Sequence, residues 1–172
     1  YHSFILSFFL LALTLRHCGA LQSPIPPVAL ITGATGRTGQ LVSDLLLERG
    51  FHLRIFCRDE AKARELFESK NSEYSKKDGG DVENCVIEYV PGDLKSMADV
   101  KTAFETSSSS LPLTHLVFLA GGEGADYKGV NYHGVTTMAK QAVQTPSIRQ
   151  IVLVSTAWAT RPYSIASLLF NT

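Results

Sequence analysis

The sequence predicts an α/β protein built on a doubly wound parallel sheet. Apolar runs alternate along the chain with segments of helical pattern. The runs are nearly continuous rather than alternating between apolar and polar residues, which is typical of parallel strands buried on both faces. The first run ends in evenly spaced glycines, a turn that joins strand to helix in many such folds. Right-handed crossovers then predict the strand order 3-2-1-4-5.

Length and composition fit one globular domain. The chain has 172 residues, of which 45% are hydrophobic and 19% are charged, and this balance excludes a disordered or fibrous protein. The 16 basic residues offset 16 acidic ones, so we expect no general binding of nucleic acid. We also expect no metal site or disulfide framework, because the cysteines form no C-x-x-C pair and the histidines show no ligand spacing. Cys57 and Cys85 are interpreted as small buried side chains, and Cys18 lies near the N-terminus.

The first unit is a strand, a glycine turn and a helix. We expect the strand over residues 28–31 and the helix from about Thr38, with one apolar side formed by Leu41, Val42, Leu45 and Leu46. In the turn, Gly33 permits a tight bend and Gly36 lets the backbone approach a pyrophosphate. Gly39 lets the helix pack close to the strand.

The glycine turn is the candidate phosphate site. The N–H groups and the positive dipole end at the start of the helix attract phosphate. The spacing is G-x-x-G-x-x-G, and an ordinary βα turn with glycines is the alternative; the flanking strand and helix favour nucleotide binding. The candidate residues are Gly33, Thr35, Gly36, Arg37, Thr38 and Gly39.

The stretch T-G-A-T-G-x-x-G from Thr32 to Gly39 resembles a signature of the short-chain dehydrogenase/reductase superfamily. The closer similarity is to its atypical, NmrA-like NAD(P)H-binding branch, and it runs from about Val28 to the C-terminus. The resemblance implies a Rossmann fold that binds NAD(P). Its implied partners are the dinucleotide cofactor and an unknown small-molecule substrate or protein.

The second expected strand, residues 53–57, ends at Arg58 and Asp59. This is where a dinucleotide fold meets the adenosine ribose; an acid would bond the ribose hydroxyls, whereas a guanidinium can fork onto a 2′-phosphate. In the NmrA-like branch a similar arginine goes with NADP(H), so we expect NADP(H) to be favoured over NAD(H). Arg37 could add a second cation. The alternative is a surface arginine paired with Asp59. A charged helix over residues 59–70 and a polar surface loop over residues 69–84 should follow.

The third expected strand, residues 86–90, is followed by Pro91-Gly92-Asp93-Leu94. In the family the aspartate of a similar G-D-L lies beside the adenine, and the backbone of its neighbour, here Leu94, helps to hold the ring. The equally weighted alternative is that Asp93 is a cap or turn residue. Ser96 should cap a helix over residues 96–106, with Asp99 at the capping-box position.

The fourth expected strand, residues 114–120, ends in small residues. Ala120, Gly121 and Gly122 would let the nicotinamide half of the cofactor lie against the backbone. A helix over residues 126–145 should follow, and the resemblance assigns Asn131 to support of the active-site side. The alternative for Asn131 is a polar residue on an otherwise packed helix.

The fifth expected strand, residues 151–154, continues into Ser155 and Thr156. In catalytic relatives a hydroxyl here polarises the substrate carbonyl, and Thr156 is the best match; a backbone cap is the alternative. Those relatives also carry Tyr-x-x-x-Lys, in which the tyrosine transfers a proton. Here Tyr163 is followed by Ser167, and no lysine follows Lys140.

Two functions from different classes are therefore carried forward. The first is an NADP(H)-dependent oxidoreductase whose C-terminal part is missing, so that the given chain binds cofactor without turnover. The second is a non-catalytic NADP(H)-binding redox sensor or scaffold protein. The segment of residues 161–170 is similar to plastid NADP-binding members that are linked to redox sensing at the chloroplast envelope.

The N-terminus predicts a targeting signal. Residues 4–15 form an apolar run that is too short for a stable membrane span, and small residues precede a plausible cleavage after Ala20. We expect a signal peptide over residues 1–20, a linker over 21–27 and an incomplete NAD(P)-binding domain over 28–172. The implied destination is the secretory pathway, or a plastid if the leader is bipartite. An uncleaved anchor or a wrong gene start is the alternative.

Overall fold

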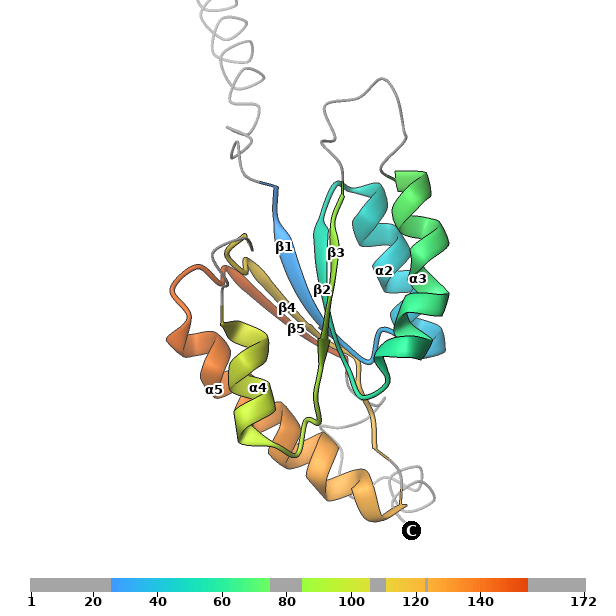
Figure 1. Ribbon diagram of the computed structural model, residues 1–172. Helices are drawn as coiled ribbons and strands as arrows, with labels where there is room; N and C mark the ends of the chain where they lie inside the picture. The colour runs from blue at the N-terminus through green and yellow to red at the C-terminus, as the bar shows by residue number, and fades with distance from the viewer. Residues whose placement is uncertain (1–25, 75–84, 106–110, 123, 155–172) are drawn as a thin grey trace, which may run out of the picture.

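A five-stranded parallel sheet forms the centre of the computed structural model, which describes residues 26–74, 85–105, 111–122 and 124–154 (Figure 1). The sheet order is β3-β2-β1-β4-β5, and each neighbouring pair is parallel. The strands are β1 (Val28–Thr32), β2 (His52–Cys57), β3 (Ile87–Pro91), β4 (His115–Phe118) and β5 (Gln150–Leu153). The predicted fold class and strand order are confirmed.

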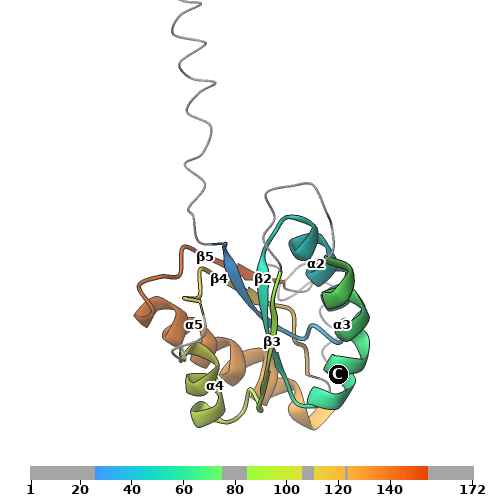
Figure 2. The same ribbon diagram turned by 45° about the horizontal axis from the view of Figure 1, so that its top comes forward.

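Helices cover both faces of the sheet (Figures 1 and 2). On one face lie α2 (Arg37–Glu48) and α3 (Glu60–Tyr74); on the other lie α4 (Met97–Phe104) and α5 (Val135–Gln144). Because successive side chains of a strand point to opposite faces, the sheet contributes to two apolar cores. Leu30 and Phe56 belong to the core beside α4 and α5, and Ile31 and Ile55 to the core beside α2 and α3. Burial on both faces explains the continuous apolar runs of β1, β2 and β4, whereas β5 at the edge of the sheet is exposed.

The predicted apolar side of α2 is wrong in part. Leu41 and Leu45 are 66% and 47% exposed. The buried residues of α2 are instead Gly39, Ser43 and Leu47, with Val42 and Leu46 packed against the core beside them. The residues Gly39, Ser43 and Leu47 follow the spacing i, i+4, i+8 of one helix face. The close backbone contact of Gly39 with the glycine turn places this face, rather than the face with Leu41, against the sheet.

The helix expected over residues 126–145 is present over residues 127–144, but part of it is π-helical. A 3-10 turn, η1 (Gly124–Asp126), is followed by a π-helical turn, η2 (Gly129–Gly134), and then by α5. The wide turn lies where Gly129 and Gly134 let the backbone come close to the loop before α4: a Cβ on Gly129 would lie 3.0 Å from Lys95, and one on Gly134 would lie 3.1 Å from Leu94. A uniform α-helical pattern in the sequence does not reveal such a turn.

The remaining sequence predictions divide between tested and untested ones. Cys57 and Cys85 are buried and free, as predicted. The predicted signal peptide, Thr156 and Tyr163 lie outside the described residues. Among the helices that the structure describes, none is long and apolar enough to cross a membrane.

Candidate functional site

The glycine turn between β1 and α2 depends on two glycines for steric reasons. Gly33 has φ +75°, a left-handed conformation, and a Cβ there would lie 2.6 Å from the backbone nitrogen of Ala120. A Cβ on Gly39 would overlap the carbonyl oxygen of Gly33 and lie 2.7 Å from the Cα of Ala34. The Gly36 N–H donates to the Gly33 carbonyl oxygen at 3.1 Å and closes the turn. Gly33 and Gly39 therefore let the segment after β4, and α2, come into backbone contact with the turn.

Gly36 differs from the other two glycines of the turn. Its backbone, at φ −77° and ψ 165°, suits any residue, and the nearest described atom to a Cβ would be the Gly33 oxygen at 3.3 Å. Packing within the described chain therefore does not demand glycine here. Gly36 is exposed at the start of α2, which has no side-chain cap. The first N–H groups of such a helix lack intrahelical partners, so the turn is a cradle that suits a phosphate.

Four strand ends meet beside this cradle. Thr32, the last residue of β1, is paired with Phe56 of β2 and Phe118 of β4. The Leu119 N–H donates to the Thr32 oxygen at 3.1 Å, and the Gly92 N–H donates to the Cys57 oxygen at 2.9 Å. The segments that follow β1, β2, β3 and β4 therefore share one edge of the sheet (Figure 1). The structure brings together the candidates that precede Gly124, namely Gly33, Thr35, Gly36, Arg37, Thr38, Gly39, Arg58, Asp93, Leu94, Ala120, Gly121 and Gly122.

The loop after β4 is held by Asn131 of η2. The Asn131 Oδ1 accepts the Gly122 N–H at 2.9 Å, and its Nδ2 donates to the Gly122 oxygen at 3.2 Å. A Cβ on Gly122 would lie 2.5 Å from the Asp126 oxygen, whereas one on Gly121 would meet no described atom within 4 Å. Asn131 is thus a positioning residue for this loop, and it lies in a π-helical turn, an element that is frequent at functional sites.

Arg58 follows β2, and its side chain is 72% exposed. The expected alternative, an ion pair with Asp59, is not what the structure shows. Asp59 accepts the Lys62 N–H at 3.0 Å and thereby caps α3. The Arg58 Nη1 lies 3.8 Å from Oδ2 of Asp126 in η1. Arg37, the first residue of α2, is also exposed.

Asp93 has a turn role in the structure. Its Oδ1 accepts the Lys95 N–H at 2.9 Å. Ser96 caps α4, as predicted, by accepting the Asp99 N–H at 3.3 Å. Asp99 does not complete a capping box with Ser96; its carboxylate accepts the Asp93 N–H at 2.9 Å instead, because the Ser96 N–H donates to the Asp93 oxygen. The side chain of Leu94 is buried in the core, which leaves its backbone for any contact with an adenine.

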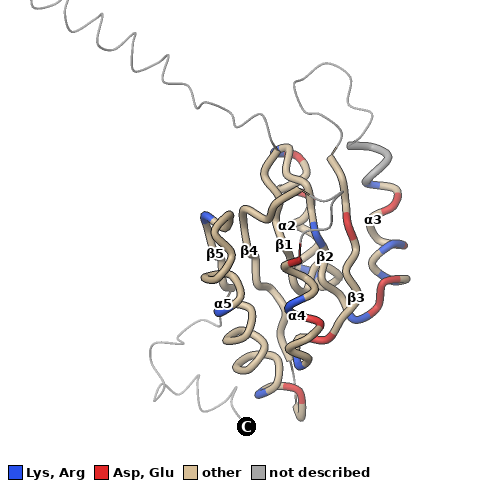
Figure 3. The backbone as a smooth tube through the Cα atoms, turned by 60° about the vertical axis from the view of Figure 1, so that its left-hand side comes forward, with Lys and Arg blue, Asp and Glu red and all other residues tan. Residues whose placement is uncertain are grey.

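Lys95 and Asp126 also lie at this edge, and no sequence pattern predicted either as a site residue. The Lys95 Nζ donates to Asp126 Oδ1 at 2.8 Å. This hydrogen bond, together with the charge of Lys95, lowers the pKa of Asp126, and it raises the pKa of Lys95. The two residues stand 31 positions apart, so no local pattern could have shown the pair. Elsewhere charges of both signs are mixed, as along α3 in Figure 3.

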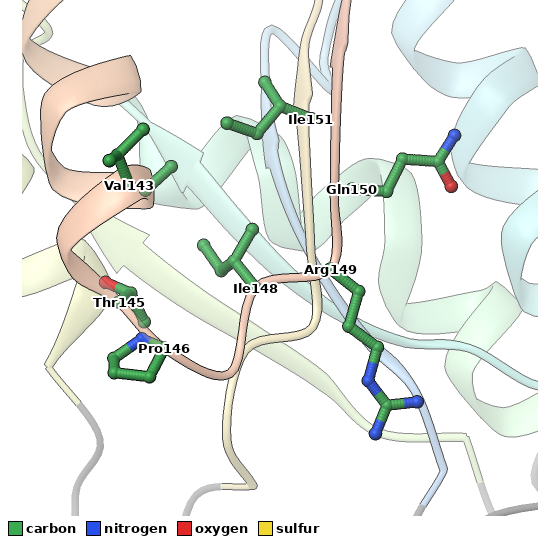
Figure 4. A pocket seen from close by; sticks show the side chains of 8 residues that line it. Val143, Thr145, Pro146, Ile148, Arg149, Gln150 and Ile151 are labelled. Atoms are coloured by element: carbon green, nitrogen blue, oxygen red, sulfur yellow. The ribbon is translucent and has the colours of Figure 1, made fainter.

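A surface groove lies far from the glycine turn, between α5 and β5 (Figure 4). It lies beside Gln150, the first residue of β5, and thus at the amino ends of the strands. Its lining residues are Ala142, Val143, Thr145, Pro146, Ile148, Arg149, Gln150 and Ile151. No group of three or more potential metal ligands occurs in the part of the chain that the structure describes. The chemistry-bearing candidates therefore gather at the opposite edge of the sheet.

Comparisons with known proteins identify the family of the chain. A family model described as NAD(P)H-binding matches residues 33–168. A search of curated proteins finds no match.

Solved structures share the fold. A short-chain type dehydrogenase/reductase from Mycobacterium ulcerans superposes with a TM-score of 0.60 at 18% identity, over 69% of this chain and 46% of that one. A variant of actinorhodin polyketide ketoreductase with NADPH superposes with a TM-score of 0.57 at 22% identity, over 72% of this chain and 48% of that one. L-sorbose reductase from Gluconobacter frateurii, complexed with NADPH and L-sorbose, superposes with a TM-score of 0.54 at 20% identity, over 67% of this chain and 45% of that one. The chain thus spans slightly less than half the length of these proteins, and the predicted resemblance is confirmed at the level of the fold.

Proposed function

The chain belongs to the NAD(P)H-binding family, and from this premise we propose that it is the NADP(H)-binding domain of an atypical, NmrA-like short-chain dehydrogenase/reductase acting as an oxidoreductase. The observation that carries the proposal is the exposed Gly36 at the uncapped start of α2, where a Cβ would meet only the Gly33 oxygen, at 3.3 Å, among the described atoms within 4 Å. A pyrophosphate bound beside Gly36 would accept hydrogen bonds from the first N–H groups of α2 and would lie at the positive end of the helix dipole.

The proposed binding surface follows the carboxyl edge of the sheet. The phosphates would lie on Gly33, Thr35, Gly36, Thr38 and Gly39. Asp93 and the backbone of Leu94 would flank the adenine. Ala120, Gly121 and Gly122 would line the nicotinamide half, and Asn131 would hold this loop through Gly122. These roles agree with the order of the strands, because ligands of open α/β sheets bind where the strand order reverses.

The proposed preference for NADP(H) depends on Arg58. Its exposed guanidinium at the end of β2 has the geometry to bind a 2′-phosphate with two hydrogen bonds. Arg37 at the start of α2 would add a second cation near the phosphates. Bound cofactor would supply a hydride, and Thr156 is proposed to polarise the carbonyl of the substrate.

The test compares NADPH binding to the wild type and to Gly36→Val. The variant should keep its fold, because the exposed backbone at this position tolerates a side chain, and should lose NADPH binding, because the branched side chain would fill the cradle. Leu41→Val, on the exposed side of the same helix, is the matched control and should bind normally. Normal binding by folded Gly36→Val would refute the proposed site.

A second function, a redox sensor or scaffold that binds NADP(H) without turnover, is favoured by one observation. Residues 161–170 are similar to the segment after the fifth strand in plastid NADP-binding members that are linked to redox sensing. Incubating the protein with NADPH and a panel of quinones, aldehydes and ketones distinguishes the oxidoreductase from the sensor or scaffold. Oxidation of NADPH that disappears in Gly36→Val supports the oxidoreductase. Binding without oxidation by the full-length natural protein supports the sensor.

A further inference from the structure

An ion cluster joins three segments that lie far apart in the sequence. Arg58 follows β2, Lys95 lies between β3 and α4, and Asp126 ends η1. The Lys95 Nζ lies 2.8 Å from Asp126 Oδ1, and the Arg58 Nη1 lies 3.8 Å from Asp126 Oδ2. The side chains of Lys95 and Asp126 are 44% and 41% exposed, so a solute can reach the cluster.

The two cations hold Asp126 unequally. Lys95 donates a hydrogen bond to Asp126. Arg58 is beyond hydrogen-bond distance from Asp126, so its N–H groups can donate to another acceptor, such as a phosphate. Lys95 also lies 3.7 Å from Asp93 Oδ2. The hydrogen bond and charge of Lys95, and then the charge of Arg58, lower the pKa of Asp126. Asp126 is therefore an anion at neutral pH beside the guanidinium proposed to bind a phosphate.

A phosphate that reaches Arg58 must approach the carboxylate of Asp126, and like charges at such separations repel. A ribose with a free 2′-hydroxyl meets no such repulsion. Resting on the proposed function, we propose that Asp126 is a specificity-determining residue that restrains the preference for NADP(H), and that Lys95 offsets this restraint. Arg58 makes NADPH bind more tightly than NADH, and the opposite charges of Asp126 and Lys95 determine how large this difference in affinity is.

The experiment measures the dissociation constants of NADPH and NADH by calorimetry for the wild type, Asp126→Asn, Lys95→Gln and the double variant. In Asp126→Asn the ratio of the NADH constant to the NADPH constant should rise about two- to fivefold, as expected for an exposed charge pair. In Lys95→Gln the ratio should fall by a similar factor. In the double variant it should return to within about twofold of the wild type, because the two effects oppose each other.

Two controls separate charge at this place from other effects. Asp44→Asn removes the same charge from an ion pair with Lys70, 2.6 Å long and located between α2 and α3, and should leave the ratio unchanged. Asp126→Glu keeps the charge and should keep a ratio near that of the wild type. A change in the urea midpoint of Asp126→Asn would indicate that η1 is destabilised, and this should change the affinities for NADPH and NADH by the same factor.

The outcomes distinguish the inference from the function on which it rests. If Asp126→Asn leaves both affinities unchanged, changes them by one common factor, or lowers the ratio, the inference is overturned while the proposed function stands. If the wild type binds neither NADPH nor NADH, the proposed function fails and the inference fails with it.

Discussion

Arg54 is the most deeply buried charged side chain among the described residues, with 1% exposure in the middle of β2. Its Nε donates to Glu88 Oε2 of β3 at 2.7 Å. Its Nη1 donates to the carbonyl oxygens of Ala103 and Glu105, each at 3.3 Å, at the end of α4. One guanidinium therefore ties two strands to a helix end, and it satisfies carbonyls that the last turn of a helix leaves without partners.

Arg54→Ala should lower the free energy of unfolding by about 3 kcal/mol, because it leaves Glu88 and two carbonyls without this donor. The measurement is urea denaturation followed by circular dichroism. Lys62→Ala is the control, since the Lys62 side chain is exposed on α3. Equal losses in Arg54→Ala and Lys62→Ala would contradict the structural role of Arg54.

Arg58→Ala tests the proposed cofactor preference at a single residue. The variant should bind NADPH roughly tenfold more weakly and NADH almost as well as the wild type, because a charge-assisted bond to the 2′-phosphate is lost. Titration with each cofactor gives both constants. Arg49→Ala removes another exposed arginine, at the far end of α2, and should change neither constant. Equal affinities for the two cofactors in the wild type would rule out the preference.

At the scale of the element, the glycine turn separates stability from binding. Gly33→Ala should destabilise the fold, because it combines a left-handed backbone with a clash against Ala120. Gly39→Ala should do the same, because its Cβ would overlap the Gly33 oxygen and push α2 away from β1. Gly36→Ala has neither problem, so its free energy of unfolding should lie within about 0.5 kcal/mol of the wild-type value. Denaturation midpoints compare the three; destabilisation by Gly36→Ala equal to the other two would refute the distinction.

At the scale of the whole molecule, burial in the α2/α3 core links stability to alkaline pH. Burial raises the pKa of Cys57 and Cys85 above 9.0, and it raises that of Tyr89 above 10.0. The folded state thus holds these protons more tightly than the unfolded state. Their contribution is complete below about pH 9 and is lost as the pH rises through the folded-state values.

The urea midpoint should therefore fall between pH 8 and pH 10.5. A variant with Cys57→Ala and Cys85→Ala should be less stable at pH 8, owing to lost packing, but should lose less stability over the same interval. A midpoint that is flat or rises with pH in the wild type would contradict this linkage.

The leader is a prediction about the whole molecule. We propose that residues 1–20 are removed on entry into the secretory route, so that the natural protein begins at Leu21. Sequencing the N-terminus of the protein isolated from its source is the measurement. A plastid location would point to a bipartite leader, and a cytosolic protein with residues 4–15 intact would refute the signal peptide.

The sequence by itself determined the features that depend on neighbouring residues. Continuous apolar runs marked β1, β2 and β4 because these strands are buried on both faces, and right-handed crossovers predicted the strand order. The turn at Gly33 and Gly39 was predictable because backbone conformation and close approach demand glycine locally. The Ser96 cap was predictable for the same reason, since it involves a residue three positions away.

Only the tertiary structure decided which groups meet across the fold. It turned Leu41 and Leu45 of α2 outward, because the contact of Gly39 with the turn sets the rotation of that helix. It placed Arg54 against Glu88 and α4, and Lys95 against Asp126, pairs that no periodicity can reveal because their partners lie on different elements. Ion pairs depend on distances between elements, and those distances exist only once the strands have paired and the helices have packed against them.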